Sequence, residues 1–188
     1  MSTPASEAPT DRYRRLAERF TTTVEAVPTG AWNNASPCEG WTAADVLAHV
    51  IESEAGLLKK TGRVVSAGSM DPADPLGSWV HARDAAQAAL EVPSCSGFEY
   101  EAFGVRTTVG ATFGSFISVD LVVHRWDIAH AAGIEETIAV EDMAFVRAFT
   151  ENMGDIAQTS GAFGPRLSVP EDADEQTKFL ALLGRSAC

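Results

Sequence analysis

The sequence has too few basic residues to form a large positively charged face. Its 188 residues contain 14 lysines and arginines against 26 aspartates and glutamates, a formal net charge of −12. Nucleic acids and anionic membranes are bound through basic surfaces, so neither is an expected partner. No uncharged apolar run reaches the roughly 20 residues of a membrane span, and the opening MSTPASEAPT has no signal-peptide character. We expect a cytoplasmic protein whose partners are small molecules.

Cysteines and the common catalytic motifs are also scarce. Cys38, Cys95 and Cys188 are far apart and form no C-x-x-C, so we expect neither a disulfide framework nor a cysteine zinc knuckle. There is no glycine-rich phosphate loop, no G-x-S-x-G and no H-E-x-x-H. Cys38 has no identifiable base in the sequence, and we interpret it as a packed loop residue rather than a nucleophile.

Helical periodicity is the main pattern that the sequence does contain. Hydrophobic residues make up 45% of the chain, enough for the core of one domain. We expect a disordered tail at 1–10, followed by a single domain at 11–188. Helices are predicted over 11–27, 42–60, 75–93, 113–133 and 140–158, with a short one near the C-terminus. Residues 98–102 alternate and predict a short hairpin or extended excursion. The predicted fold is all-α, an up-and-down four-helix bundle with these additions.

The stretch 113–133, FGSFISVDLVVHRWDIAHAAG, is apolar nearly all round, as expected of a central helix, yet one stripe carries Asp120, His124 and Asp127. Two interpretations stay open for the first two residues. They could form a satisfied ion pair or hydrogen bond one turn apart inside the core, or both could point at one cation. We expect Asp127 to support such a site or to pair with Arg125 or another cation.

A third metal-ligand candidate lies on the second predicted helix. Thr42 and Asp45 match a capping box, which fixes the start of that helix and puts His49 at the border of its apolar stripe. The alternative is a half-exposed surface histidine. Two antiparallel helices could aim His49 at the same point as Asp120 and His124. Glu52, which follows His49, could orient its imidazole or be solvated.

Two imidazoles and one carboxylate leave coordination positions open. This donor set suits a catalytic zinc ion, and it also suits Ni²⁺ or Fe²⁺. The open positions would accept water or a thiolate, because a bound metal lowers the pKa of water and thiols.

Two segments carry a family resemblance. SPCEGWTAADVLAHVIE at 36–52 and DLVVHRWDIAHAAG at 120–133 resemble the metal-binding domain of the mycothiol-dependent maleylpyruvate isomerase group, within the DinB/YfiT-like four-helix-bundle superfamily, and in particular its short actinobacterial members. The resemblance extends from the first helix to the closing LALLGR. In that family a histidine on the second helix, and an acidic residue and a histidine four apart on a later helix, hold the metal. These positions fall on His49, Asp120 and His124.

The resemblance also limits the activity that it implies. The isomerase has glutamate at the position of Asp120, and it has an additional C-terminal domain that contributes to catalysis. The 28 residues after Ser160 are too few for such a domain. The resemblance therefore implies a divalent metal, with mycothiol or bacillithiol as co-substrate, and a transferase, isomerase or hydrolase reaction on an unidentified small molecule rather than maleylpyruvate isomerisation itself.

Two alternatives to an enzyme stay open. One is a metal- or ligand-binding module without turnover, and the other is a bundle whose polar residues pair in the core and bind no metal. The sequence does not determine the oligomeric state, and a homodimer is compatible with it.

Overall fold

Helices make up most of the described chain, and two short strands form a separate hairpin. The structure is a computed structural model that describes residues 7–62, 69–102, 104–154 and 163–186. The helices are α1 (Pro9–Ala26), a 3-10 turn (Thr29–Ala31), α2 (Ala43–Lys59), α3 (Pro75–Leu90), α4 (Pro93–Ser96), α5 (Val109–Thr112), a π-helical segment (Phe113–Ile117), α6 (Ser118–Ala131), α7 (Val140–Met153) and α9 (Glu175–Leu182). The strands β1 (Glu99–Ala102) and β2 (Val105–Thr108) pair antiparallel. The expected hairpin and short C-terminal helix are thus confirmed.

Local signals explain where the helices begin. Thr42 and Asp45 form the predicted capping box, in which each side chain accepts a hydrogen bond from the other residue's backbone N–H. Asp74 caps α3 by accepting from the Gly77 N–H, and Pro75 occupies the first turn. Helix α1 begins at Pro9, two residues before the expected start. Residues 1–6 of the expected tail lie outside the described residues.

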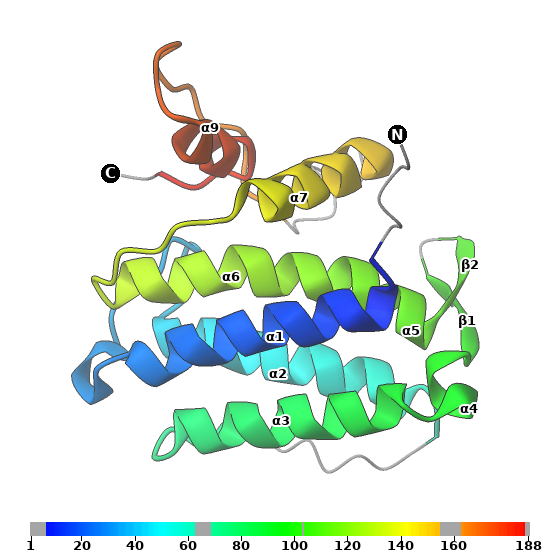
Figure 1. The fold of residues 1–188 in the computed structure, drawn as a ribbon. Helices are drawn as coiled ribbons and strands as arrows, with labels where there is room; N and C mark the ends of the chain where they lie inside the picture. The colour runs from blue at the N-terminus through cyan, green and yellow to red at the C-terminus, as the bar shows by residue number, and fades with distance from the viewer. Residues whose placement is uncertain (1–6, 63–68, 103, 155–162, 187–188) are drawn as a thin grey trace.

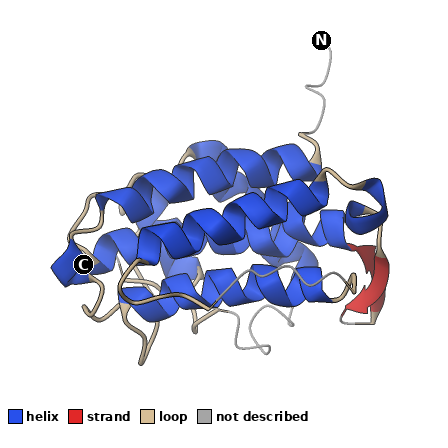
Figure 2. Cartoon of the chain, turned by 90° about the horizontal axis from the view of Figure 1, so that it is seen from below, coloured by secondary structure: helices blue, strands red, loops and turns tan. Residues whose placement is uncertain are grey.

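Four long helices, α1, α2, α3 and α6, lie side by side and are called the central helices here (Figures 1 and 2). Each contacts two of the others: α1 packs on α6 and α3, and α2 packs on α3 and α6. Their facing stripes bury large apolar side chains, including Phe20, Leu47, Trp79 and Ile128. Most of the hydrophobic core therefore lies between these four helices, and α7 and α9 add a few residues to it.

The direction of the chain does not alternate through the central helices. Near its end, α2 meets the start of α1, where the Tyr13 hydroxyl donates to Glu54. Near its start, α3 meets the end of α1, where Trp79 Nε1 donates to the Thr21 hydroxyl. Both helices are thus antiparallel to α1 and run the same way as each other (Figure 1). The expected up-and-down order, in which successive helices run in opposite directions, is wrong for α2 and α3. Two consecutive helices can run in the same direction only if the connection spans the length of a helix, and the connection at 60–74 is long enough to do so.

Helix α6 is the most buried of the central helices, as its composition predicts. Every residue from 121 to 129 is buried. The π-helical segment precedes it directly, and the Ser118 N–H donates a hydrogen bond to the Phe113 carbonyl, five residues earlier in the chain. Gly114 within that segment is required by close packing, because a Cβ atom there would lie 2.2 Å from the Pro9 side chain of α1.

Helix α7 lies across the outside of the central helices, with α9 beside it (Figure 1). The helical spacing of apolar residues over 140–158 predicts a buried stripe on α7 that includes Val140 and Ala144, and the structure shows that this prediction is wrong for both residues. Val140 is 75% exposed and Ala144 is exposed, whereas Asp142 is 1% exposed. The reason lies on α1, where Arg15 and Arg19 both bind the Asp142 carboxylate. Residues 155–158 of the predicted helix lie outside the described residues.

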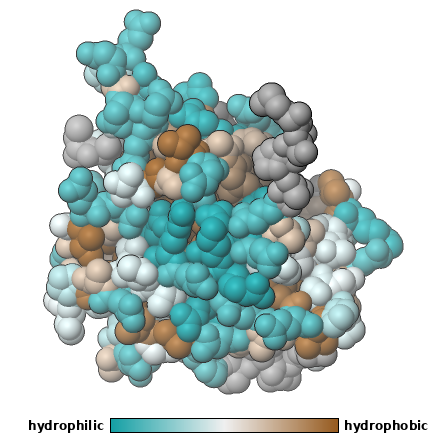
Figure 3. All heavy atoms as spheres, in the orientation of Figure 1, coloured by the Kyte–Doolittle hydropathy of each residue, from teal (hydrophilic) through white to brown (hydrophobic). Residues whose placement is uncertain are grey.

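The exposed face that carries α1 is mostly hydrophilic, and its apolar residues form small separate patches (Figure 3). This agrees with the acidic composition. None of the helices in the described ranges is both long and apolar enough to cross a membrane.

Candidate metal centre

His49, Asp120 and His124 come together between α2 and α6. Each offers one potential ligand atom, and these three atoms all lie within 4.8 Å of one another. His49 comes from the second turn of α2, while Asp120 and His124 are one turn apart on α6. The two imidazole rings stand edge to face, with centroids 5.1 Å apart. The structure therefore places all three residues that the sequence singled out at one point.

The spacing within this cluster suits ligands better than a hydrogen-bonded pair. His49 Nε2 lies 3.6 Å from Asp120 Oδ2, which is too long for a hydrogen bond. Two ligands about 2.1 Å from a tetrahedral zinc ion are separated by roughly 3.4 Å. The side chains of His49 and Asp120 are 37% and 31% exposed, so the cluster is open to solvent on one side. A small molecule could reach it there.

Trp41 covers part of the cluster. Its ring centroid lies 5.1 Å from that of His49 and 6.5 Å from that of His124. Because the segment before α2 is rich in Pro, Gly and Asn, its two tryptophans, Trp32 and Trp41, are expected to anchor it to the body of the protein. Trp32 is buried, but Trp41 is 36% exposed, and its position beside the two histidines makes it part of the site.

Asp127 fixes the orientation of His124. The His124 Nδ1 atom lies 2.9 Å from Asp127 Oδ2, one turn along α6. Burial raises the pKa of Asp127, but the hydrogen bond with His124 and the positive charge of Arg185 outweigh it and bring the pKa to about 2. Asp127 is therefore a carboxylate, and the His124 Nδ1 must carry the proton that it accepts. This leaves the lone pair on His124 Nε2, the nitrogen that a metal would use.

Arg185 completes the environment of Asp127 from the far end of the chain. Its Nη2 donates to Asp127 Oδ2 at 3.1 Å, and its Nε donates to Oδ1 at 3.3 Å. The sequence offered Arg125 as one possible partner of Asp127, but Arg125 instead pairs with Glu136. Sequence reasoning missed Arg185, whose only signal was its place in the closing LALLGR. Since Asp127 is fully buried, this pair neutralises a charge that would otherwise be costly.

A second group of potential ligands shares His124 with the first: Cys38, His124 and Asp127. A guanidinium already occupies the position that a metal ion would take in this group. Arg185 Nη2 lies 3.5 Å from Cys38 Sγ and also donates to Asp127 Oδ2. Burial and the charge of Asp127 raise the pKa of Cys38 to about 12, despite Arg185. The thiol is thus protonated and donates to Asp127 Oδ2 at 3.3 Å. Cys38 resembles the packed loop residue that we expected and not a thiolate ligand.

The two glutamates that follow His49 lie in different surroundings. Glu52, which we expected either to orient the His49 imidazole or to be solvated, is exposed, and its carboxylate forms no hydrogen bond or ion pair with the described residues. Glu54 is fully buried, accepts a 3.0 Å hydrogen bond from Tyr13 at Oε1, and has no partner at Oε2 among the described residues. Burial and the charge of Asp120 raise its pKa to about 8, although the Tyr13 hydrogen bond lowers it. The structure therefore shows a second acidic group near the cluster.

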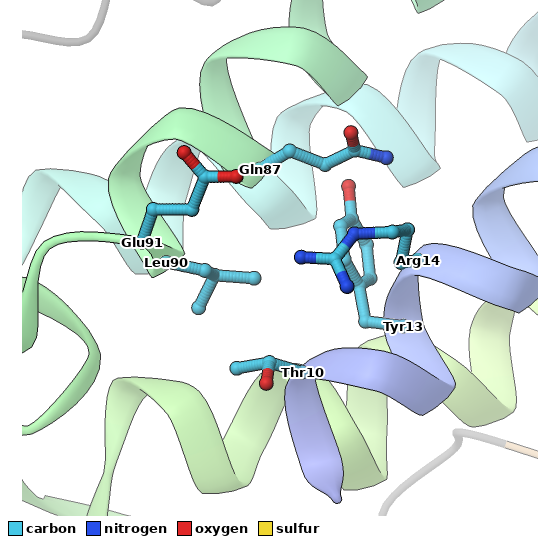
Figure 4. Close-up of a pocket in the computed structure, with 6 residues that line it drawn as sticks. All are labelled: Thr10, Tyr13, Arg14, Gln87, Leu90 and Glu91. Atoms are coloured by element: carbon cyan, nitrogen blue, oxygen red, sulfur yellow. The ribbon is translucent and has the colours of Figure 1, made fainter.

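A small pocket of about 100 Å³ lies away from the cluster, between the start of α1 and the end of α3. Figure 4 shows the side chains that line it: Thr10, Tyr13, Arg14, Gln87, Leu90 and Glu91. None of these is a histidine or cysteine, and the pocket is too small for most organic ligands. It is not part of the candidate metal centre.

Fold and site together define the class of protein: it is a mostly helical protein with a cluster of histidine and carboxylate side chains between two helices. Residues 13–129 match the family model described as the mycothiol maleylpyruvate isomerase N-terminal domain, and the chain belongs to that family. The match contains all three clustered residues and Asp127, but it ends before Arg185.

Relatives among curated proteins give no activity. The chain is 25% identical over 181 residues to the uncharacterized proteins MT0763 and Rv0738, from two strains of Mycobacterium tuberculosis. The alignment covers 93% of this chain and 96% of each relative. No solved structure matches the chain.

Proposed function

We propose that this protein binds one divalent metal ion through His49, Asp120 and His124, and that it is a thiol-dependent transferase or isomerase acting on a small molecule. The observation that carries the proposal is the convergence of three ligand atoms within 4.8 Å, from two different helices. The family match supports the thiol, since the family is described by a mycothiol-dependent isomerase. The packing of the central helices supports the DinB/YfiT-like four-helix bundle.

The residues present fit the proposed ion. Nitrogen and oxygen donors of this kind favour Zn²⁺, with Ni²⁺ or Fe²⁺ as alternatives. His124 is held through Nδ1 by an ionised Asp127, so its Nε2 is available. When bound, the metal would lower the pKa of a thiol such as mycothiol or bacillithiol and so supply a nucleophile at neutral pH.

The protein's own side chains have separate roles in this proposal. Asp127 and Arg185 hold His124 in position, and Trp41 shields one side of the two histidines from water. Asp120 and His49 stay partly exposed and leave an approach for the thiol and its acceptor. Such chemistry belongs in the cytoplasm, where low-molecular-weight thiols are kept reduced.

Metal content, measured by mass spectrometry on tag-free protein, tests the site. The wild type is expected to contain near-stoichiometric metal, and His49→Ala and His124→Ala are expected to lose it. His130→Ala is the matched control, because His130 lies on α6 but is exposed and stacks on Trp126. A wild type that stays empty after incubation with zinc, nickel or iron would refute the site.

The thiol is tested separately on cobalt-substituted protein. Addition of mycothiol is expected to change the visible spectrum of the wild type. A metal-loaded protein whose spectrum ignores mycothiol, bacillithiol and other thiols would instead be a metal-binding module without this chemistry.

A further inference from the structure

A second polar pocket lies on the side of α6 that faces α1. It has a volume of about 400 Å³, within the range of small-molecule sites. Its polar lining consists of two arginines, three threonines and one glutamate: Arg19, Thr22, Thr23, Arg125, Thr137 and Glu136. The first three belong to α1, Arg125 belongs to α6, and the others lie between α6 and α7. None of these residues belongs to the candidate metal centre.

Arg125 is buried in this pocket with one guanidinium nitrogen, Nε, left without a hydrogen-bond partner among the described residues. Its side chain is 5% exposed, and its nearest charged partner is Glu136, with Nη2 and Oε1 3.4 Å apart. The guanidinium donates no hydrogen bond to any residue in the described ranges, and Nε is fully buried without a partner there. Leaving a buried N–H donor such as Nε unpaired is costly. Within the described residues, Arg125 therefore lacks an acceptor at this position.

The neighbouring charges are already paired among themselves. Arg19 binds Asp142, which is also held by Arg15. Arg19 also lies 3.6 Å from Glu141, which is largely exposed. The Glu136 carboxylate accepts a 2.9 Å hydrogen bond from Thr23 through its other oxygen. Arg19 is thus neutralised by acidic partners, and Arg125, whose one ionic contact is 3.4 Å long, is the least well paired cation of the lining.

We propose that this pocket binds a small organic molecule through an oxyanion, a carboxylate or a phosphate group. The planar fork of Arg125 matches such a group in a bidentate contact, and threonine hydroxyls can donate to its remaining oxygens. Glu136 occupies part of this fork in the free protein. The site is independent of the metal proposal, because no residue is shared between them.

Titration with inorganic phosphate and with succinate, each against sodium chloride at equal ionic strength, tests the pocket. The readout is the arginine Nε–Hε region of a nitrogen-15 NMR spectrum. One resonance, assigned to Arg125 by its absence in Arg125→Gln, is expected to shift and saturate. Tighter binding of phosphate assigns a phosphorylated ligand, and tighter binding of succinate assigns a carboxylic acid. The control is Arg106→Gln, which removes the same charge from the exposed strand β2 and is expected to bind like the wild type.

Glu136→Gln is expected to raise the affinity for the anion, whereas Arg125→Gln is expected to lower it. This second variant keeps the proposal testable if Arg125→Gln does not fold. The change removes the competing carboxylate but keeps an acceptor for Thr23. Affinity for the better probe is expected to rise on the order of tenfold, the equivalent of one lost ion pair. The proposal is overturned if neither the wild type nor Glu136→Gln shows a saturable shift. It is equally overturned if Arg106→Gln weakens binding as much as Arg125→Gln does.

Discussion

His124 Nδ1 and Asp127 Oδ2 lie 2.9 Å apart on one face of α6, and this contact determines which nitrogen of His124 is free to bind a ligand. The carboxylate is itself held by Arg185, 58 residues further along the chain. Arg185, near the C-terminus, therefore positions Asp127, and Asp127 in turn positions the candidate ligand His124. Substitutions of Asp127 and of Arg185 test these two contacts separately.

Asp127→Asn is expected to weaken metal binding by about 10- to 100-fold, because a neutral amide no longer stabilises the protonated Nδ1 of His124. Competition with a chromophoric chelator measures the change. Asp142→Asn is the matched control, since Asp142 is another buried carboxylate held by arginines, but on α7. Equal metal affinity in Asp127→Asn and the wild type would show that Asp127 does not orient the ligand.

Cys38→Ser is expected to retain the full metal content of the wild type, because the thiol is protonated and Arg185 occupies the cation position beside it. Peptide-resolved alkylation at pH 8 is expected to label Cys38 only slowly in the folded protein and rapidly after denaturation. Loss of metal in Cys38→Ser would favour the group of Cys38, His124 and Asp127 as the true site.

Arg185→Gln is expected to lower the free energy of unfolding by about 3 to 5 kcal/mol at pH 7, because it leaves Asp127 buried without its cation. Urea denaturation measures the loss. The folded pKa of Asp127 is depressed to about 2, so the pair stabilises above the unfolded pKa near 3.8 and this contribution disappears as the pH falls toward 2. The difference between variant and wild type is therefore expected to shrink below pH 4.

Arg106→Gln is the control for Arg185→Gln. Arg106 pairs with Glu99 on the hairpin, where the two side chains are 80% and 59% exposed. Removing that pair is expected to cost less than about 1 kcal/mol, because solvent screens it. Similar losses in both variants would mean that the Arg185 pair contributes no more than a surface contact.

Glu54→Gln is expected to stabilise the metal-free protein at pH 8 and to leave its stability unchanged near pH 4. The folded pKa of Glu54 is raised from 4.5 to about 8, so the folded state keeps a proton that the unfolded state releases between these values. Stability therefore falls as the pH rises through this range, by an amount on the order of a few kcal/mol. Glutamine removes this penalty and still accepts from Tyr13.

Thermal unfolding in the presence of a chelator, at pH 4, 6 and 8, measures the effect of Glu54→Gln. Glu52→Gln serves as the control, since Glu52 lies on the same helix but is exposed. A Glu54→Gln protein that is less stable than the wild type at every pH would mean that the carboxylate has a partner worth more than its burial costs.

Local patterns were sufficient to predict the elements that carry the candidate ligands. The capping box fixed the start of α2 and with it the position of His49, and the apolar surroundings of Asp120 and His124 identified α6 as central. The structure brings these three residues together, while metal binding itself stays a prediction.

Contacts between distant segments could not be predicted from the sequence. Arg185 reaches Asp127 from beyond α9, and no periodicity links the two. The buried Asp142 contradicts the apolar stripe of α7 because its partners are arginines of α1. The common direction of α2 and α3 could not be predicted either, because the connection between them is long enough for α3 to run in either direction.

The π-helical segment Phe113–Ile117 makes the site tolerant of one deletion. A π turn contains about one residue more than an α turn, so the loss of one residue there would leave a regular α turn and change the facing of the following residues little. Asp120 and His124 would then still point toward His49. A relative that keeps the D-x-x-x-H motif but is one residue shorter in this segment is therefore expected to have kept the site, and a length difference confined to the segment is no argument against shared function.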